Sequence, residues 1–194
     1  MKLFFDTEFT GLHKDTTLVS IGIVSEDGKK FYAEFTDFDW EPVHKDKWLL
    51  DNVVNKLHYR KHGSEKTYMP DYHIGTKASI SEMLENWLKQ FDEVQFVSDV
   101  CHYDFVLLID LFGGAFDLPK NVSAVCYDIN QDIARHYGIS DREAFDRSRE
   151  DIVPELYGQQ IEGEKHNFGF LHPPFQICVC EVQQHLPHFG VVIY

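Results

Sequence analysis

The hydrophobic pattern of the first 36 residues predicts three successive β-strands. Leu3 to Asp6 is an apolar run that ends in acid, Leu18 to Val24 is apolar and β-branched, and Phe31 to Thr36 alternates. Alternation with a period of two is typical of a strand with one buried face. Asp27-Gly28 lies between the last two runs and favours a type I′ turn. We therefore expect an antiparallel meander.

Helices and strands are predicted to alternate through the middle of the chain. Apolar residues of Ile80 to Phe91 recur on one face of a helix, and Ser79 with Glu82 fits a capping box at its start. The later elements expected are a strand at Val94–Ser98, a helix at Tyr103–Leu111, a strand at Val122–Cys126 and a helix at Ile129–Tyr137. Residues 37–78 are interpreted as a surface insertion. This order predicts an α/β fold with a mixed sheet flanked by helices.

Composition narrows the class of protein. A chain of 194 residues with 43% hydrophobic content can build the core of one domain, and it contains no apolar stretch that would span a bilayer. An acid at position 6 comes too early for a secretory signal, so we expect a cytoplasmic protein with reduced cysteines. The net charge of −14 argues against binding a phosphate backbone through Lys and Arg alone. Divalent cations would reverse the sign of an acidic site.

Two segments carry candidate chemistry. In Phe5-Asp6-Thr7-Glu8-Phe9-Thr10-Gly11-Leu12, Asp6 and Glu8 stand two apart on a strand and should share a face, where Mg²⁺ or Mn²⁺ would relieve their repulsion. An Asp-x-Glu pair can also be simply solvated. In the second segment Asp104 falls near a predicted helix start, where the local sequence alone is compatible with a capping residue.

The first segment resembles the first motif of the DEDD exonuclease superfamily, which includes proofreading domains, oligoribonuclease and ribonuclease T. The likeness is greatest to small bacterial and phage 3′–5′ exoribonucleases of the DEDDh type, and it covers about residues 1–36 and 79–167. It implies a ribonuclease H-like fold, two Mg²⁺ or Mn²⁺ ions, and a substrate with an RNA or single-stranded DNA 3′ end. Many relatives are homodimers.

The resemblance also implies roles for individual residues. Asp6 would bridge both ions and Glu8 would hold the ion on the side of the nucleophile. Asp104 would support the second ion through water, with Asp99, a subsidiary acid, as the competing choice for this position. His166, in Gly163-Glu164-Lys165-His166-Asn167, would take the proton from the attacking water. Thr7 and Phe9 would contact the terminal nucleotide, although Phe9 is equally interpretable as a core residue.

The chain departs from the family pattern after Asn167. The family places an Asp five residues after the His, whereas this chain has Leu171. We therefore expect weak metal affinity and low turnover, and we divide the chain into an exonuclease-like domain at 1–167 and an atypical tail at 168–194. A frame change in the gene would explain the tail, and a zinc site is the alternative for its four metal-binding side chains: Cys178, Cys180, His185 and His188.

Two other functions remain open at this point. The missing acid favours a catalytically silent module that binds nucleic acid or protein, while the retained acids oppose it. The same metals would also support a phosphohydrolase that acts on free nucleotides.

Overall fold

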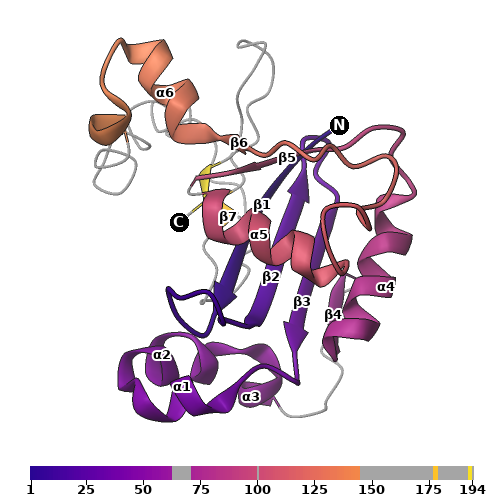
Figure 1. Cartoon of the computed structure of the whole chain (residues 1–194), viewed down its shortest axis with the longest axis vertical. Helices are drawn as coiled ribbons and strands as arrows, with labels where there is room; N and C mark the ends of the chain where they lie inside the picture. Colours follow the sequence, from indigo (N-terminus) through magenta and orange to yellow (C-terminus); the bar gives the residue numbers. More distant parts are fainter. Residues whose placement is uncertain (63–70, 100, 145–176, 179–191, 194) are drawn as a thin grey trace, which may run out of the picture.

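The computed structural model describes residues 1–62, 71–99, 101–144, 177–178 and 192–193 (Figure 1). A six-stranded sheet with the strand order β4-β3-β2-β1-β5-β6 forms its centre. The first three strands pair antiparallel, and each of the other three lies parallel to its neighbour. The strands are β1 (Lys2–Phe9), β2 (Leu18–Ser25), β3 (Lys30–Phe35), β4 (Tyr72–Gly75), β5 (Gln95–Ser98) and β6 (Tyr127–Asp128). The predicted meander and the mixed sheet are confirmed, and the arrangement is that of a ribonuclease H-like fold.

The turn between β2 and β3 differs from the predicted type I′ turn. The Gly28 N–H donates to the Ser25 carbonyl, and the Ser25 N–H donates to the Lys29 carbonyl, both at 2.9 Å. The loop therefore has three residues, and the last of them, Gly28, has a positive φ of 85°. A three-residue hairpin loop commonly places glycine at this left-handed position.

Residues 37–78 contribute to the core and to the sheet, so their interpretation as a surface insertion was wrong. They form α1 (Trp40–Lys45), α2 (Lys47–Asn52), the 3₁₀ helix η1 (Val54–Lys56), α3 (His58–His62) and the edge strand β4. Six of their apolar side chains belong to the main core: Phe38, Val43, Leu49, Val53, Val54 and Leu57. The three α-helices gather at one end of the sheet (Figure 1).

A buried carboxylate connects this region to β3. Glu34 is fully buried, and its oxygens accept hydrogen bonds from the backbone N–H groups of His58 and Tyr59 at 2.5 and 3.0 Å. The hydroxyls of Tyr32 and Tyr72 donate to the same carboxylate at 2.9 and 2.7 Å. Because two of the donors belong to the first turn of α3, the charge also interacts favourably with the start of that helix.

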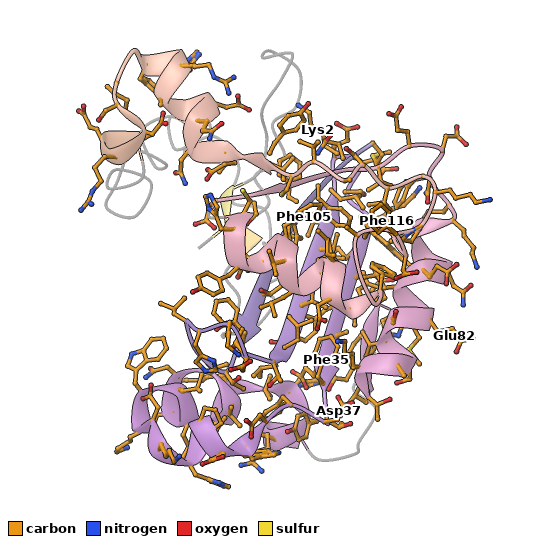
Figure 2. All side chains as sticks on the ribbon, in the orientation of Figure 1. Lys2, Phe35, Asp37, Glu82, Phe105 and Phe116 are labelled. Carbon is orange, nitrogen blue, oxygen red and sulfur yellow. The ribbon has the colours of Figure 1, made fainter. Side chains whose placement is uncertain are left out.

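Two helices cover the same side of the sheet, α4 (Lys77–Leu88) and α5 (Cys101–Leu111) (Figure 1). On α5, Phe105 packs edge-on or tilted against Phe5 and Phe96, with ring centroids 6.5 and 6.4 Å away, where the helix crosses the strands (Figure 2). Helix α4 begins before the predicted capping box. Thr76 is its N-cap, and Glu82 is exposed on the outer side of the helix (Figure 2).

The later elements are close to those predicted, with one exception. Helix α6 (Ile129–Tyr137) has the predicted bounds and ends at Gly138, which has a φ of 64°. The predicted strand at Val122–Cys126 is reduced to one parallel bridge between Val94 and Val122, and the paired strand β6 follows it. The strand that pairs with β5 is therefore Tyr127–Asp128, directly after the residues that the apolar pattern indicated.

Little of the C-terminal part lies within the described residues. The short strands β7 (Ile177–Cys178) and β8 (Val192–Ile193) pair antiparallel. Of the four zinc ligands predicted in the tail, Cys178 alone lies within the described residues, so that site stays a prediction. The predictions for His166, for Leu171 and for a boundary at 167 fall outside the described ranges and also stay predictions. Among the helices that the structure describes, none combines the length and apolar character that crossing a membrane requires.

Candidate functional site

Strand β1 presents two different faces to its surroundings. Phe5, Thr7 and Phe9 all contact residues of α5. Asp6 and Glu8 alternate with them and therefore share the opposite face, as predicted from their spacing. Both acids are partly buried. The residue that pairs with Asp6 on β2 is Gly22, whose lack of a side chain leaves the Asp6 carboxylate without a bulky neighbour on that strand.

Asp104 is held at the edge of β1 by three hydrogen bonds. Its Oδ1 accepts from the Thr7 backbone N–H at 3.2 Å and from the Thr7 hydroxyl at 2.5 Å. Its Oδ2 accepts from the Ser98 hydroxyl at 3.0 Å. The pairing between β1 and β5 ends at Phe4 and Val97, so the Thr7 N–H lies beyond the ladder and is available to the carboxylate. Asp104 is only 5% exposed, which explains why its oxygens need these donors.

A third acid joins Asp6 and Asp104. One carboxylate oxygen from each of Asp6, Asp99 and Asp104 lies within 4.8 Å of the others. Asp99 follows β5 directly and Asp104 lies in the first turn of α5, so both candidates for the mid-chain acid lie beside Asp6. Asp99 and Asp104 therefore both lie close enough to Asp6 to be the mid-chain acid of the predicted metal site.

The acids strongly influence one another's protonation. Burial, and then the neighbouring charges of Asp104, Glu8 and Asp99, raises the pKa of Asp6 well above its usual value. Burial, followed by the charge of Asp104, raises the pKa of Glu8 from 4.5 to about 7. Burial also raises the pKa of Asp104 from 3.8 to about 6, while the hydrogen bonds from Thr7 and Ser98 act in the opposite direction. Glu8 thus belongs electrostatically to the cluster.

The donor set fits hard divalent cations. Within the described part of the chain, no Lys or Arg forms an ion pair with Asp6, Glu8 or Asp104. Buried carboxylates that repel one another gain stability when a cation is placed between them. Oxygen ligands of this kind suit Mg²⁺ and Mn²⁺ better than soft metals. The cluster therefore offers the oxygen ligands with which a hard divalent cation could bind.

An aromatic pair borders the cluster. Phe9 and Tyr103 are stacked, with ring centroids 5.5 Å apart and an interplanar angle of 18°. Phe9 is partly buried and also packs against the core, while Tyr103 is 37% exposed. Phe9 therefore packs against the core, as its interpretation as a core residue requires, and its contact with a nucleotide stays a prediction.

Thr7 has a different environment from the one expected of a nucleotide contact. It is 4% exposed, and its hydroxyl and backbone N–H both donate to Asp104. Contact between Thr7 and a nucleotide stays a prediction. Sequence reasoning gave no role to Ser98 or Tyr103, although Ser98 ends β5 and Tyr103 precedes Asp104. Their positions in the strand-to-helix segment were the only signal, and neither residue type is distinctive there.

Comparison with known proteins identifies relatives. No protein-family model matches the chain. Two proteins named 3′–5′ exoribonuclease, from two strains of Mycobacterium tuberculosis, are each 30% identical to it over 131 residues. The alignment covers 68% of this chain and 73% of each relative. The similarity thus extends over most of the length of both proteins.

Proposed function

Because this chain belongs to the 3′–5′ exonuclease family, we propose that it is a two-metal enzyme of the DEDDh type that removes nucleotides from RNA 3′ ends. The observation that carries the proposal is the convergence of Asp6, Asp99 and Asp104 within 4.8 Å. These residues come from segments more than 90 positions apart in the sequence, as the 97-residue separation of Thr7 and Asp104 illustrates. Bringing three carboxylates this close together is energetically costly because their charges repel, and a bound cation would offset that cost.

We assign the cations to Asp6, Glu8 and Asp104, with Asp99 beside them. Two divalent cations held there would supply the positive charge needed to activate a water molecule and to stabilise the leaving 3′ oxygen. Asp6 and Glu8 stand on the same face of β1, so both carboxylates can bind on one side of the strand. Asp104 is kept in a single orientation by Thr7 and Ser98.

The general base would be His166, which the resemblance places at the position that accepts a proton from water. An imidazole has an ordinary pKa of about 6.5, which suits reversible proton transfer near neutral pH. The Leu at position 171 leaves the site with one acid fewer than the family pattern. We therefore propose weak metal binding and impaired turnover relative to a complete DEDDh site.

Phe9 would interact with the terminal base through stacking, which tolerates any base and predicts weak sequence preference. The stacked partner Tyr103 supports this assignment, because it precedes Asp104 in the chain and restrains the Phe9 ring. Thr7 is then placed mainly as a positioning residue for Asp104, with its nucleotide contact still to be tested.

The direct test is an exonuclease assay on a 5′-labelled single-stranded RNA oligomer with Mg²⁺ or Mn²⁺. We expect a ladder of products shortened from the 3′ end and no products when a chelator is added. Asp6→Asn should abolish the ladder. Asp92→Asn is the matched control, because it removes the same charge at an exposed position preceding β5, at the opposite end of that strand from Asp99.

Two outcomes would contradict the proposal. One is shortening that Asp6→Asn leaves unchanged, which would point to a different site or a contaminating nuclease. The other is internal cleavage of an oligomer whose 3′ end is blocked. A parallel reaction on single-stranded DNA of the same sequence measures the sugar preference, and size-exclusion chromatography tests for a homodimer.

One second candidate has a specific observation in its favour. The absence of an acid at position 171 favours a nuclease-like module that binds RNA or a protein without hydrolysing RNA. Such a module would bind the oligomer in Mg²⁺ while leaving its length unchanged over long incubation. A phosphohydrolase would instead release phosphate from mononucleotides and leave the oligomer intact. A parallel reaction on mononucleotides therefore separates it from the other two functions.

We place the exonuclease activity in residues 1–167 and regard 168–194 as an atypical tail. A frame change after Asn167 predicts that another reading frame of the gene encodes an Asp-bearing helix. Sequencing the gene tests this, and no such alternative frame would count against the explanation.

A further inference from the structure

A second group of metal-binding side chains lies beside the acidic cluster and plays no part in the proposed exonuclease reaction. Cys101 and His102 begin α5, and Asp128 lies at the junction of β6 and α6. The ligand atoms of these three residues all lie within 4.8 Å of one another. Cys126 lies close to Cys101: burial is the main cause that raises the pKa of both thiols, and each thiol also affects the pKa of the other. It is therefore a candidate for the fourth ligand.

The donor atoms of this group differ from those of the acidic cluster. Two thiols, an imidazole and a carboxylate form a soft to borderline set, which selects zinc over magnesium. Ligands of a tetrahedral zinc ion at about 2.0–2.3 Å lie roughly 3.5 Å apart. The ligand atoms of Cys101, His102 and Asp128, which lie within 4.8 Å of one another, would therefore have to approach by no more than about 1 Å. Rotation of surface side chains supplies that movement, since His102 is exposed and the other three residues are partly buried.

The known contacts of these residues account for the group only in part. Asp128 caps α6, because its Oδ1 accepts a hydrogen bond from the Asn130 N–H at 2.9 Å. The Cys126 thiol lies 3.7 Å from the Tyr127 carbonyl oxygen. Neither contact explains why a second cysteine and a histidine come together at the same point. Cys101 and Cys126 both have free thiols, so both are available as ligands.

We infer that Cys101, His102, Cys126 and Asp128 form a zinc site that ties the start of α5 to the β6–α6 junction. Binding would release the two thiol protons to solvent and leave both sulfurs as thiolates. Zinc here would link two chain segments 25 residues apart. The same segment of α5 carries Asp104 three residues after Cys101, so the ion would also restrain the helix end that supports the acids.

This site is distinct from the zinc ligands considered for the tail, and it does not depend on exonuclease activity. The test is a Co²⁺ titration of the full-length, metal-free chain under reducing conditions. Cobalt bound to thiolates produces sulfur-to-metal charge-transfer absorption that oxygen ligands do not produce. We expect one equivalent of Co²⁺ to generate this absorption and one equivalent of Zn²⁺ to remove it.

Variants assign the ligands. Cys126→Ser and His102→Gln should each lower the Zn²⁺ affinity of the site, measured by displacement of Co²⁺, by on the order of 100-fold or more. Replacing a residue that only hydrogen-bonds to a metal ligand already lowers metal affinity about 10–100-fold, and these two residues are proposed as ligands themselves. His102 is exposed, so its replacement should leave the fold intact, which circular dichroism verifies. The double variant Cys178→Ser/Cys180→Ser is the control and should retain the absorption.

The outcomes are decisive in both directions. No charge-transfer absorption, or absorption that disappears only in the tail double variant, would overturn the inference. Formation of a Cys101–Cys126 disulfide in zinc-containing buffer would overturn it as well. An inactive chain that still shows the absorption would leave the zinc site standing and refute the proposed function alone.

Discussion

Replacing Glu8 by Gln should stabilise the metal-free protein at neutral pH. The pKa of Glu8 is raised from 4.5 to about 7, first by burial and then by the charge of Asp104. A carboxyl whose pKa is higher in the folded state binds its proton more tightly there than in the unfolded chain. The contribution of Glu8 to the free energy of unfolding is therefore fully present below about pH 4.5, and it is lost as the pH rises towards 7.

The magnitude follows from the size of the pKa shift. One pKa unit corresponds to about 1.4 kcal/mol, so the shift of Glu8 amounts to roughly 3 kcal/mol of lost stability between the two pKa values. Partial exposure of Glu8 reduces this to about 2 kcal/mol. Asp6 reinforces the effect, because the charge of Glu8 also raises the pKa of Asp6. Glutamine keeps the size of the side chain and removes both contributions.

The assay is urea denaturation of the wild type and Glu8→Gln in a chelator, at several values from about pH 5 to about pH 8. We expect the two free energies of unfolding to be similar at the acidic end and the variant to be more stable at the alkaline end. Glu82→Gln is the control, because Glu82 is exposed on the outer side of α4 (Figure 2). Its curve should run parallel to that of the wild type.

Addition of Mn²⁺ provides an independent check on the same reasoning. A ligand that binds only the folded state raises the free energy of unfolding. The increase grows with the logarithm of the ratio between the ligand concentration and the Kd. Mn²⁺ should therefore raise the stability of the wild type at neutral pH and raise that of Glu8→Gln less. A difference between wild type and variant that does not change with pH would refute the account of burial and carboxylate repulsion.

Three further predictions concern individual contacts. Thr7→Val removes the hydroxyl that donates to Asp104, so exonuclease turnover should fall about tenfold. Thr7→Ser keeps a hydroxyl and should have turnover close to that of the wild type. Equal turnover of the Val and Ser variants would contradict this prediction. Glu34→Gln should lower the free energy of unfolding, measured in urea, by about 2–4 kcal/mol. Four donors face this buried carboxylate, and an amide cannot accept from all of them. A loss under about 1 kcal/mol would show that these hydrogen bonds contribute little. Phe9→Leu should raise the KM for an RNA oligomer severalfold with little change in kcat, and an unchanged KM would remove Phe9 from the substrate site.

The first half of the fold could be predicted because its elements have clear patterns. The strands of the meander and the stripe on Ile80, Leu84 and Leu88 are visible as apolar periodicity, and these three side chains are buried. The start of α4 was predicted three residues late, since the sequence contains a capping pair at Ser79 as well as the true N-cap Thr76. Several residues near a helix start can serve as caps, and only the packed helix decides between them.

The insertion could not be interpreted correctly from local pattern. Its apolar residues are spread over three short helices and a 3₁₀ turn, none long enough to show a stripe. Glu34 looked like the polar position of an alternating strand, yet it is fully buried. Its burial depends on donors up to 38 positions away, such as the Tyr72 hydroxyl. Contacts at that separation leave no signal in a window of neighbouring residues.

The sequence by itself determined which side chains could bind a cation and which face of β1 carries Asp6 and Glu8, because alternation along a strand is a local property. Tertiary structure alone decided that Asp99 and Asp104 both lie beside Asp6, that Thr7 orients Asp104, and that Cys101 meets Cys126. These neighbours depend on the parallel placement of β5 next to β1 and of β6 next to β5. That placement follows from the packing of the whole core, in which distant segments bury their apolar faces together.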